Sequence, residues 1–144
     1  QSEKAESNGG EEVQADKPVA GLLEKGEEDA SESPVNMKSA MSRFDNDTEF
    51  FKTMLNEFLG YVPDQIRTIE EAVKSGDADA VQKTGHSIKG ASGMLSADMV
   101  SYVALSIENK GRDNDLADIF VLVETLKSEI SNLEDFAKTL TTQA

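Results

Sequence analysis

The chain has 144 residues and a formal net charge of −14, with 28 acidic side chains, 14 lysines and arginines, and a single histidine. It contains no cysteine, which excludes disulfide scaffolds and thiol catalysis, and the single histidine excludes metal centres built from several imidazoles. Because phosphate neutralisation needs clustered lysine and arginine, the acidic balance argues against nucleic acid or a membrane surface as a partner. No apolar run approaches the roughly 18 residues of a membrane span and no signal-peptide pattern is present, so we expect a cytoplasmic protein.

The first 35 residues differ in composition from the rest of the chain. They carry ten acidic residues against three lysines, together with glycine, serine and proline and only scattered apolar residues. Such a segment cannot bury enough apolar surface to offset the entropy of ordering it. We therefore predict a disordered acidic linker over residues 1–35 and a folded domain over residues 36–144.

A helical pattern begins at the N-terminal end of the predicted folded domain. A short helix is expected over residues 37–43 with Asn36 as its N-cap, and Asn46 or Asp47 opens the next helix. That second helix carries an apolar stripe at spacings of three and four residues, formed by Phe51, Leu55, Phe58, Val62, Ile66, Ile69 and Val73. The stripe continues through Pro63, which predicts one long helix with a kink near residues 60–63.

A turn at residues 75–77 precedes a third helix that is expected to end near residues 93–96. Its inner stripe is formed by Val81, Gly85, Ile88, Ser92 and Leu95. Ser96 or Asp98 is expected to cap a fourth helix, which carries Val100, Val103, Ala104 and Ile107.

Gly111 is expected to end the fourth helix in a C-terminal cap, after which Asp113 or Asn114 opens the last helix. The last helix carries a seam at alternating spacings of three and four, formed by Leu116, Ile119, Val123, Leu126, Ile130, Leu133, Ala137 and Leu140. No segment shows the alternation of a β-strand, and short connections between long helices force neighbouring helices to be antiparallel. The predicted fold is all-α: an antiparallel up-down four-helix bundle with a short additional N-terminal helix and a disordered N-terminal tail.

The third helix places several polar residues around His86. On a helical wheel, His86 lies well away from the apolar stripe and should face solvent. Gln82 lies one turn before it and Gly90 one turn after it, while Lys83 and Lys89 flank it at i−3 and i+3. An exposed imidazole is largely unprotonated at neutral pH and is available as a nucleophile, and the lysines would offer positive charge to an anionic group on the ring.

Three glycines in or near this helix need an explanation, because an interior glycine costs a helix roughly 1 kcal/mol relative to alanine. Gly85 lies on the inner stripe, where a missing side chain allows a neighbouring helix to approach closely. Gly90 lies outside, beside the imidazole, where it leaves space for a large group to reach the ring. Gly93 either extends that open surface or helps to end the helix.

The segment His86-Ser87-Ile88-Lys89-Gly90-Ala91-Ser92 resembles the histidine-containing phosphotransfer (HPt) motif of bacterial multistep phosphorelays, in which a Lys-Gly pair follows the phosphorylated histidine at i+3 and i+4. The resemblance spans about residues 36–140 and includes Arg43-Phe44, residues 50–63, Gly76-Asp77 and the pair Ile107-Glu108. The sequence departs from the family pattern at Gly85, where the family often has alanine, and at Ser96, where it often has glycine.

The resemblance implies that His86 is the phospho-acceptor. Lys89 and Lys83 would then lie near the phosphate, Gly90 would provide clearance, and Gln82 would orient the ring or the phosphate. The implied partners are the receiver domain of a response regulator and a hybrid histidine kinase. The Mg²⁺ ion is expected on the receiver only, with no metal or cofactor held by this chain.

The chain is expected to act as a phosphoryl carrier without autonomous kinase activity, since it has no glycine-rich nucleotide loop. We expect a monomer without direct membrane contact. A helical protein-protein interaction module in which His86 is incidental is the alternative interpretation. A carboxylate-bridged metal bundle needs inward-facing Glu-x-x-His pairs, and the residue three positions before His86 is Lys83.

Overall fold

The computed structural model describes residues 33–142, with side chains described up to residue 140. The regular secondary structure in this part of the chain is all helix, as predicted, with no strand. Its helices are α2 (Met37–Arg43), α3 (Thr48–Ser75), α4 (Ala78–Met94), α5 (Asp98–Arg112) and α6 (Ile119–Thr142). The predicted linker over residues 1–35 lies almost wholly outside the described residues.

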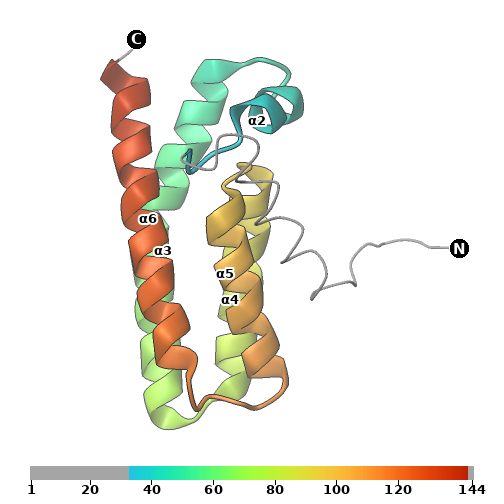
Figure 1. The fold of residues 1–144 in the computed structure, drawn as a ribbon, viewed down its shortest axis with the longest axis vertical. Helices are drawn as coiled ribbons and strands as arrows, with labels where there is room; N and C mark the ends of the chain where they lie inside the picture. Colours follow the sequence, from blue (N-terminus) through green and yellow to red (C-terminus); the bar gives the residue numbers. More distant parts are fainter. Residues whose placement is uncertain (1–32, 143–144) are drawn as a thin grey trace, which may run out of the picture. The chain divides into compact units, whose positions relative to one another are not determined.

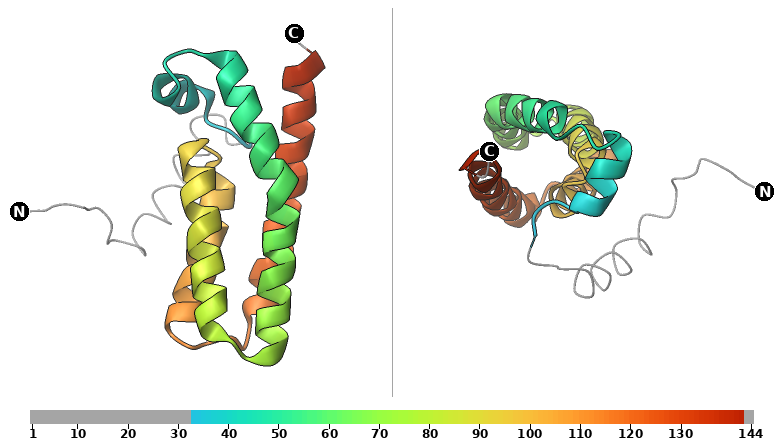
Figure 2. Two further views of the ribbon diagram at one scale, coloured as in Figure 1. Left: turned by 180° about the vertical axis from the view of Figure 1, so that it is seen from behind. Right: turned by 90° about the horizontal axis from the view of Figure 1, so that it is seen from above.

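The four long helices alternate in direction around a common core, which confirms the antiparallel bundle (Figure 1). Viewed along the bundle, α3 and α6 lie next to each other on one side and α4 and α5 lie on the other (Figure 2). All the predicted seam positions of α3 and α6 are buried or packed against the core, as the spacings of three and four required. The most extensive helix contact is between α4 and α5.

Helix α3 is continuous through Pro63, as its apolar stripe predicted. Its N-cap is Asp47, whose carboxylate accepts from the backbone N–H of Phe50, and the short helix α2 is capped in the same way by Asn36. The chain before α2 is also fixed. Val35 is buried in the core, and the Asn36 N–H donates to the carbonyl of Ser96 in the loop between α4 and α5.

The loop between α4 and α5 corrects one prediction, because neither Ser96 nor Asp98 is the N-cap of α5. The N-cap is Ala97, which makes no side-chain cap, and Asp98 is already helical. Ser96 has a φ of +58°, and the N–H of Ala97 donates back to the carbonyl of Ser92. Ser96 therefore occupies the left-handed position that ends α4, where a glycine is usual, and cannot adopt the extended backbone of an N-cap.

The end of α5 corrects two further predictions. Gly111 lies inside the helix, and the left-handed residue that terminates α5 is Asn114, with a φ of +55°. The N–H of Asp115 donates to the carbonyl of Lys110, which closes a Schellman motif around Asn114. Because Asn114 is occupied in ending one helix, it cannot open the next, and α6 begins only at Ile119, with Leu116 packed against the core from the loop.

Candidate functional site

His86 lies midway along α4, on the surface of the bundle. Gly85, Ile88 and Ser92 form the buried side of the helix, which turns the imidazole outward as predicted. The side chain is 67% exposed, yet it is fixed at one end, because its Nδ1 lies 3.0 Å from Oε2 of Glu108 on α5. The ring is therefore accessible to another protein while being held in one orientation.

Two glycines allow α4 and α5 to approach closely enough for this contact. A Cβ atom at Gly85 would lie 2.9 Å from the backbone nitrogen of Glu108, and one at Gly111 would lie 2.5 Å from the backbone nitrogen of Gln82. Each helix thus places a glycine against the backbone of the other, close to the His86–Glu108 pair. The packing role predicted for Gly85 is confirmed, and Gly111 has the same role from the opposite helix.

The nearly buried carboxylate of Glu108 is surrounded by three cationic or hydrogen-bonding groups. Its side chain is only 7% exposed. Lys89 Nζ lies 2.8 Å from its Oε1, while Arg112 Nη2 lies 3.5 Å from Oε2, the oxygen that also faces His86. A buried negative charge is tolerated only when it is paired in this way.

The protonation of Glu108 follows from the balance of these contacts. Burial acts to raise the pKa of the carboxyl, but the hydrogen bond and charge of Lys89, followed by those of His86, outweigh it and leave the pKa below its ordinary value of 4.5. Glu108 is therefore ionised at neutral pH and acts as an acceptor toward the His86 ring.

This shift predicts how Glu108 contributes to stability as pH changes. A carboxyl with a lowered pKa in the folded state stabilises the fold fully above its unfolded value and loses that contribution as pH falls through the folded value. We expect Glu108→Gln to lower the free energy of unfolding by about 1–2 kcal/mol at pH 7, because Lys89 and His86 lose a charged acceptor. The difference from wild type should begin to shrink as pH falls below about 4.5, the ordinary value that applies to the unfolded chain, and should be lost as pH falls through the lower pKa of Glu108 in the folded protein.

Urea unfolding of both proteins at pH 7 and in acid measures this difference directly. Asp115→Asn provides a matched control, since Asp115 is an exposed carboxylate paired with Lys110 at 3.2 Å and should contribute little at either pH. A difference between wild type and Glu108→Gln that stays constant or grows in acid would contradict the assignment.

The surface beside His86 is open at Gly90 and polar at Ser87. Nothing lies within 4 Å of the position that a Cβ atom would take at Gly90, as expected for a residue that leaves space beside the ring. A Cβ at Gly93 would make only an ordinary contact, at 3.5 Å from Ser101 Oγ. On the α3 side, Gln65 Nε2 donates to Ser87 Oγ over 2.9 Å, which ties the residue after His86 to the neighbouring helix.

The remaining candidates from the sequence lie apart from the His86–Glu108–Lys89 contact. Lys83 Nζ lies 3.0 Å from Asp79 on its own helix, and the hydrogen bond and charge of Asp79 raise the pKa of this exposed lysine. The backbone of Gln82 packs against Gly111, and among the described residues its side chain forms no hydrogen bond with His86. The structure thus brings Lys89 to the site and holds Lys83 in a different ion pair.

Sequence reasoning placed Glu108 only as part of a family resemblance and did not select Arg112. A signal for Glu108 was present, because it lies four residues after Ala104 and three before Gly111, on the inward face of α5. An acidic residue on a buried stripe requires a positively charged partner, and the nearest lysine or arginine on a facing helix is the expected one. Arg112 follows Glu108 by four residues on the same helix, so the spacing of an i,i+4 ion pair was a signal for it as well.

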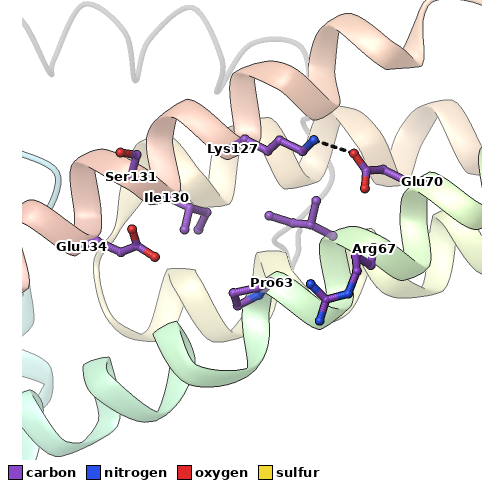
Figure 3. Close-up of a pocket in the computed structure, with 8 residues that line it drawn as sticks. Pro63, Arg67, Glu70, Lys127, Ile130, Ser131 and Glu134 are labelled. Carbon is purple, nitrogen blue, oxygen red and sulfur yellow. Dashed lines mark ion pairs between the residues drawn. The ribbon is translucent and has the colours of Figure 1, made fainter.

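A separate hollow of about 330 Å³ lies between α3 and α6 (Figure 3). Its lining combines apolar and charged groups: Pro63, Ile66, Arg67, Glu70, Lys127, Ile130, Ser131 and Glu134. Lys127 Nζ lies 2.6 Å from a carboxylate oxygen of Glu70. None of its lining residues belongs to α4 or α5, so this hollow is not part of the His86 site.

Within residues 33–142 no three side chains of the metal-binding acidic, histidine or cysteine type cluster together. None of the helices in this part of the chain has the length and apolar character needed to cross a bilayer.

Comparison with known proteins identifies the family of this chain. The model of the Hpt domain family matches residues 53–136, more than half of the chain. No curated protein matches.

Two solved structures share the fold. Histidine-containing phosphotransfer protein B (HptB) from Pseudomonas aeruginosa PAO1 superposes with a TM-score of 0.62 at 21% sequence identity, covering 90% of this chain and 94% of that one. The HPT domain of the Hpt sensor hybrid histidine kinase from Shewanella superposes with a TM-score of 0.66 at 20% identity, covering 77% of this chain and 96% of that one. The chain therefore belongs to the Hpt domain family and has a histidine phosphotransfer role in a phosphorelay.

Proposed function

We propose that His86 is the residue that carries the phosphoryl group, and that Nε2 is the atom that accepts it. The observation that supports this most directly is the contact between His86 Nδ1 and the ionised Glu108 carboxylate at 3.0 Å, beneath a ring that is 67% exposed. His86 is also the only histidine among the 144 residues. A carboxylate can only accept, so it holds the ring proton on Nδ1 and leaves the lone pair on Nε2.

The transfer then needs no general base. The Nε2 lone pair attacks phosphorus of a phosphoaspartate on the receiver, the bond from phosphorus to the aspartate oxygen breaks, and the receiver regains its carboxylate. The proton stays on Nδ1, so the phosphorylated ring is an imidazolium whose positive charge faces Glu108. Because this charge develops during the reaction, Glu108 stabilises the product and the transition state more than it stabilises the neutral, unphosphorylated ring.

Lys89 and Gly90 serve the phosphoryl group itself. Lys89 is the closest cation to the site, three residues after His86 on the same face of α4, and its charge would offset the phosphoryl oxygens. Gly90 keeps the approach to the ring open for the receiver. Lys83 is paired with Asp79 on its own helix. The contribution of Gln82 and Lys83 would be to position the phosphate or to add positive potential.

The partners follow from this chemistry. A receiver domain supplies the phosphoaspartate and the Mg²⁺ that neutralises it, so this chain would need no metal or cofactor of its own. A histidine kinase stands upstream of the receiver, and this chain acts as a carrier that does not itself use ATP. One exposed histidine on the surface of a bundle suits a monomer that meets one partner at a time.

The test is to incubate the chain with a receiver domain carrying ³²P-phosphoaspartate and to analyse the label that moves. Label on this chain should be acid-labile and base-stable, as expected for phosphohistidine, and mass spectrometry should place it on His86. An Nδ1–H signal retained in the ¹⁵N spectrum of the phosphorylated ring would assign the phosphorus to Nε2.

Two outcomes would overturn the proposal. Label that is stable to acid or labile to base, and that lies on a serine or an aspartate, would show that His86 is not the acceptor. A folded chain that binds a panel of receivers tightly but accepts no label from any of them would favour an interaction module in which His86 is incidental.

A further inference from the structure

We infer that Arg112 replaces Lys89 as the counter-ion of Glu108 when His86 becomes phosphorylated. This inference rests on the proposed function and concerns what the site must do after the phosphoryl group arrives. Arg112 is a positioning residue here, since it acts on Glu108 and does not touch the reacting atoms.

Lys89 would face two competing anions once His86 is phosphorylated. In the unphosphorylated protein its Nζ is held 2.8 Å from Oε1 of Glu108, and the side chain is only 30% exposed. A lysine bound to a buried carboxylate is not free to neutralise a phosphoryl group on the outer nitrogen of His86. To neutralise the phosphoryl group, the Lys89 ammonium must at least partly move away from the Glu108 carboxylate.

The departure of Lys89 would leave Glu108 with too little compensation. Its carboxylate is 7% exposed, and a buried charge that loses one partner is strongly destabilised. The Nδ1–H of His86 remains on Oε2, but the ring already shares its new positive charge with the phosphoryl oxygens. Oε1, which Lys89 occupied, would face no cation.

Arg112 is the only other cation that the described residues place within 4 Å of this carboxylate. Its Nη2 lies 3.5 Å from Oε2, one helical turn beyond Glu108 on the same helix. The distance is long for a hydrogen bond and the side chain is 51% exposed, while the other terminal nitrogen, Nη1, donates to Oδ1 of Asn109 on the same helix. The guanidinium is thus held near Glu108 without being fully engaged with it. A small movement would bring it onto the carboxylate as Lys89 leaves, and α5 itself would not have to shift.

This exchange predicts where a substitution at Arg112 acts. Arg112→Gln should leave the urea midpoint of the unphosphorylated chain unchanged, because Lys89 and His86 already compensate Glu108. At equilibrium with a receiver, it should lower the ratio of phosphohistidine to phosphoaspartate about fivefold, because the phosphorylated state alone depends on Arg112. Arg112→Lys keeps the charge and should restore the ratio to within about twofold of wild type.

Lys110→Gln is the matched control. It removes the same charge two residues away on the same helix, but Lys110 is paired with Asp115 at 3.2 Å and should not affect the ratio. The direct test is a cycle with Glu108→Gln, in which no buried charge remains to be compensated. In that background, Arg112→Gln should have no further effect on the ratio.

The outcomes separate this inference from the proposed function. If wild type accepts no label on His86, the proposed function fails. If wild type is labelled normally but Arg112→Gln behaves like Lys110→Gln, only the counter-ion exchange is wrong. An Arg112→Gln effect that persists in the Glu108→Gln background would also overturn it, because Arg112 would then act on the phosphoryl group and not on Glu108.

Discussion

His86→Gln should abolish phosphoryl transfer while leaving the bundle intact. No other side chain in the sequence can form phosphohistidine, so label from a phosphorylated receiver should fall to background. The structural cost should be small, because the ring is 67% exposed and makes one hydrogen bond, worth about 1 kcal/mol. Lys89 still compensates Glu108 when the imidazole is removed.

The measurement is ³²P transfer from the receiver, run beside circular dichroism and urea unfolding of the same preparations. The glutamine variant should match the wild-type spectrum, bind the receiver within a few-fold of wild type, and carry no label. Lys110→Gln, with a surface substitution away from the ring, should be labelled normally. A folded His86→Gln protein that still accepts phosphate in an acid-labile form would exclude His86 as the acceptor.

Most of the bundle could be predicted because its helices have strong and uninterrupted periodicity. The stripe of the 28-residue helix α3 continues through Pro63, so even a helix-breaking residue did not obscure it. The cap at Asn36 was predicted, and Asp47 was one of the two candidates for the next cap, because these side chains make the capping bonds themselves. These features are local, and the sequence contains all the information needed to recognise them.

The errors have a common physical origin. Ser96 and Asn114 were both interpreted as residues that start a helix, because serine and asparagine are good N-caps, whereas both adopt left-handed backbone to end the preceding helix. Gly111 was interpreted as a helix end for the converse reason. Glycine at a helix end and glycine at a helix contact look the same in one sequence, and only the position of the neighbouring helix distinguishes them.

The functional site also combines local features, which the sequence could predict, with contacts between helices, which it could not. His86, Lys89 and Gly90 lie on one helix and were found by counting turns, while the contact that orients the ring comes from Glu108 on another helix, 22 residues away. The sequence indicated an acidic residue on a buried stripe but not which oxygen would face which nitrogen. That detail determines the tautomer, and it depends on how closely α4 and α5 approach.

The close approach of α4 and α5 predicts that the same substitution at two glycines will have opposite effects. At Gly111 an added methyl would lie 2.5 Å from the nitrogen and 2.8 Å from the Cα of Gln82, both of which are backbone atoms that cannot rotate away. Gly111→Ala must therefore separate the helices. Overpacking of this kind costs up to about 3 kcal/mol, and the better helix propensity of alanine returns about 1 kcal/mol, which leaves a net loss of about 2 kcal/mol. At Gly90 the methyl meets nothing within 4 Å, so Gly90→Ala should gain about 1 kcal/mol.

Urea unfolding of the two variants should thus place them on opposite sides of wild type, about 3 kcal/mol apart. Phosphoryl transfer should also separate from stability. Gly111→Ala moves Glu108 away from His86 and should slow transfer under conditions where the protein remains folded, because the ring loses the acceptor that fixes its tautomer. Gly90→Ala should be more stable than wild type and no faster in transfer, since the methyl occupies the receiver's approach. Equal stability of the two variants would show that α4 and α5 can separate without cost, and that their contact does not hold the site together.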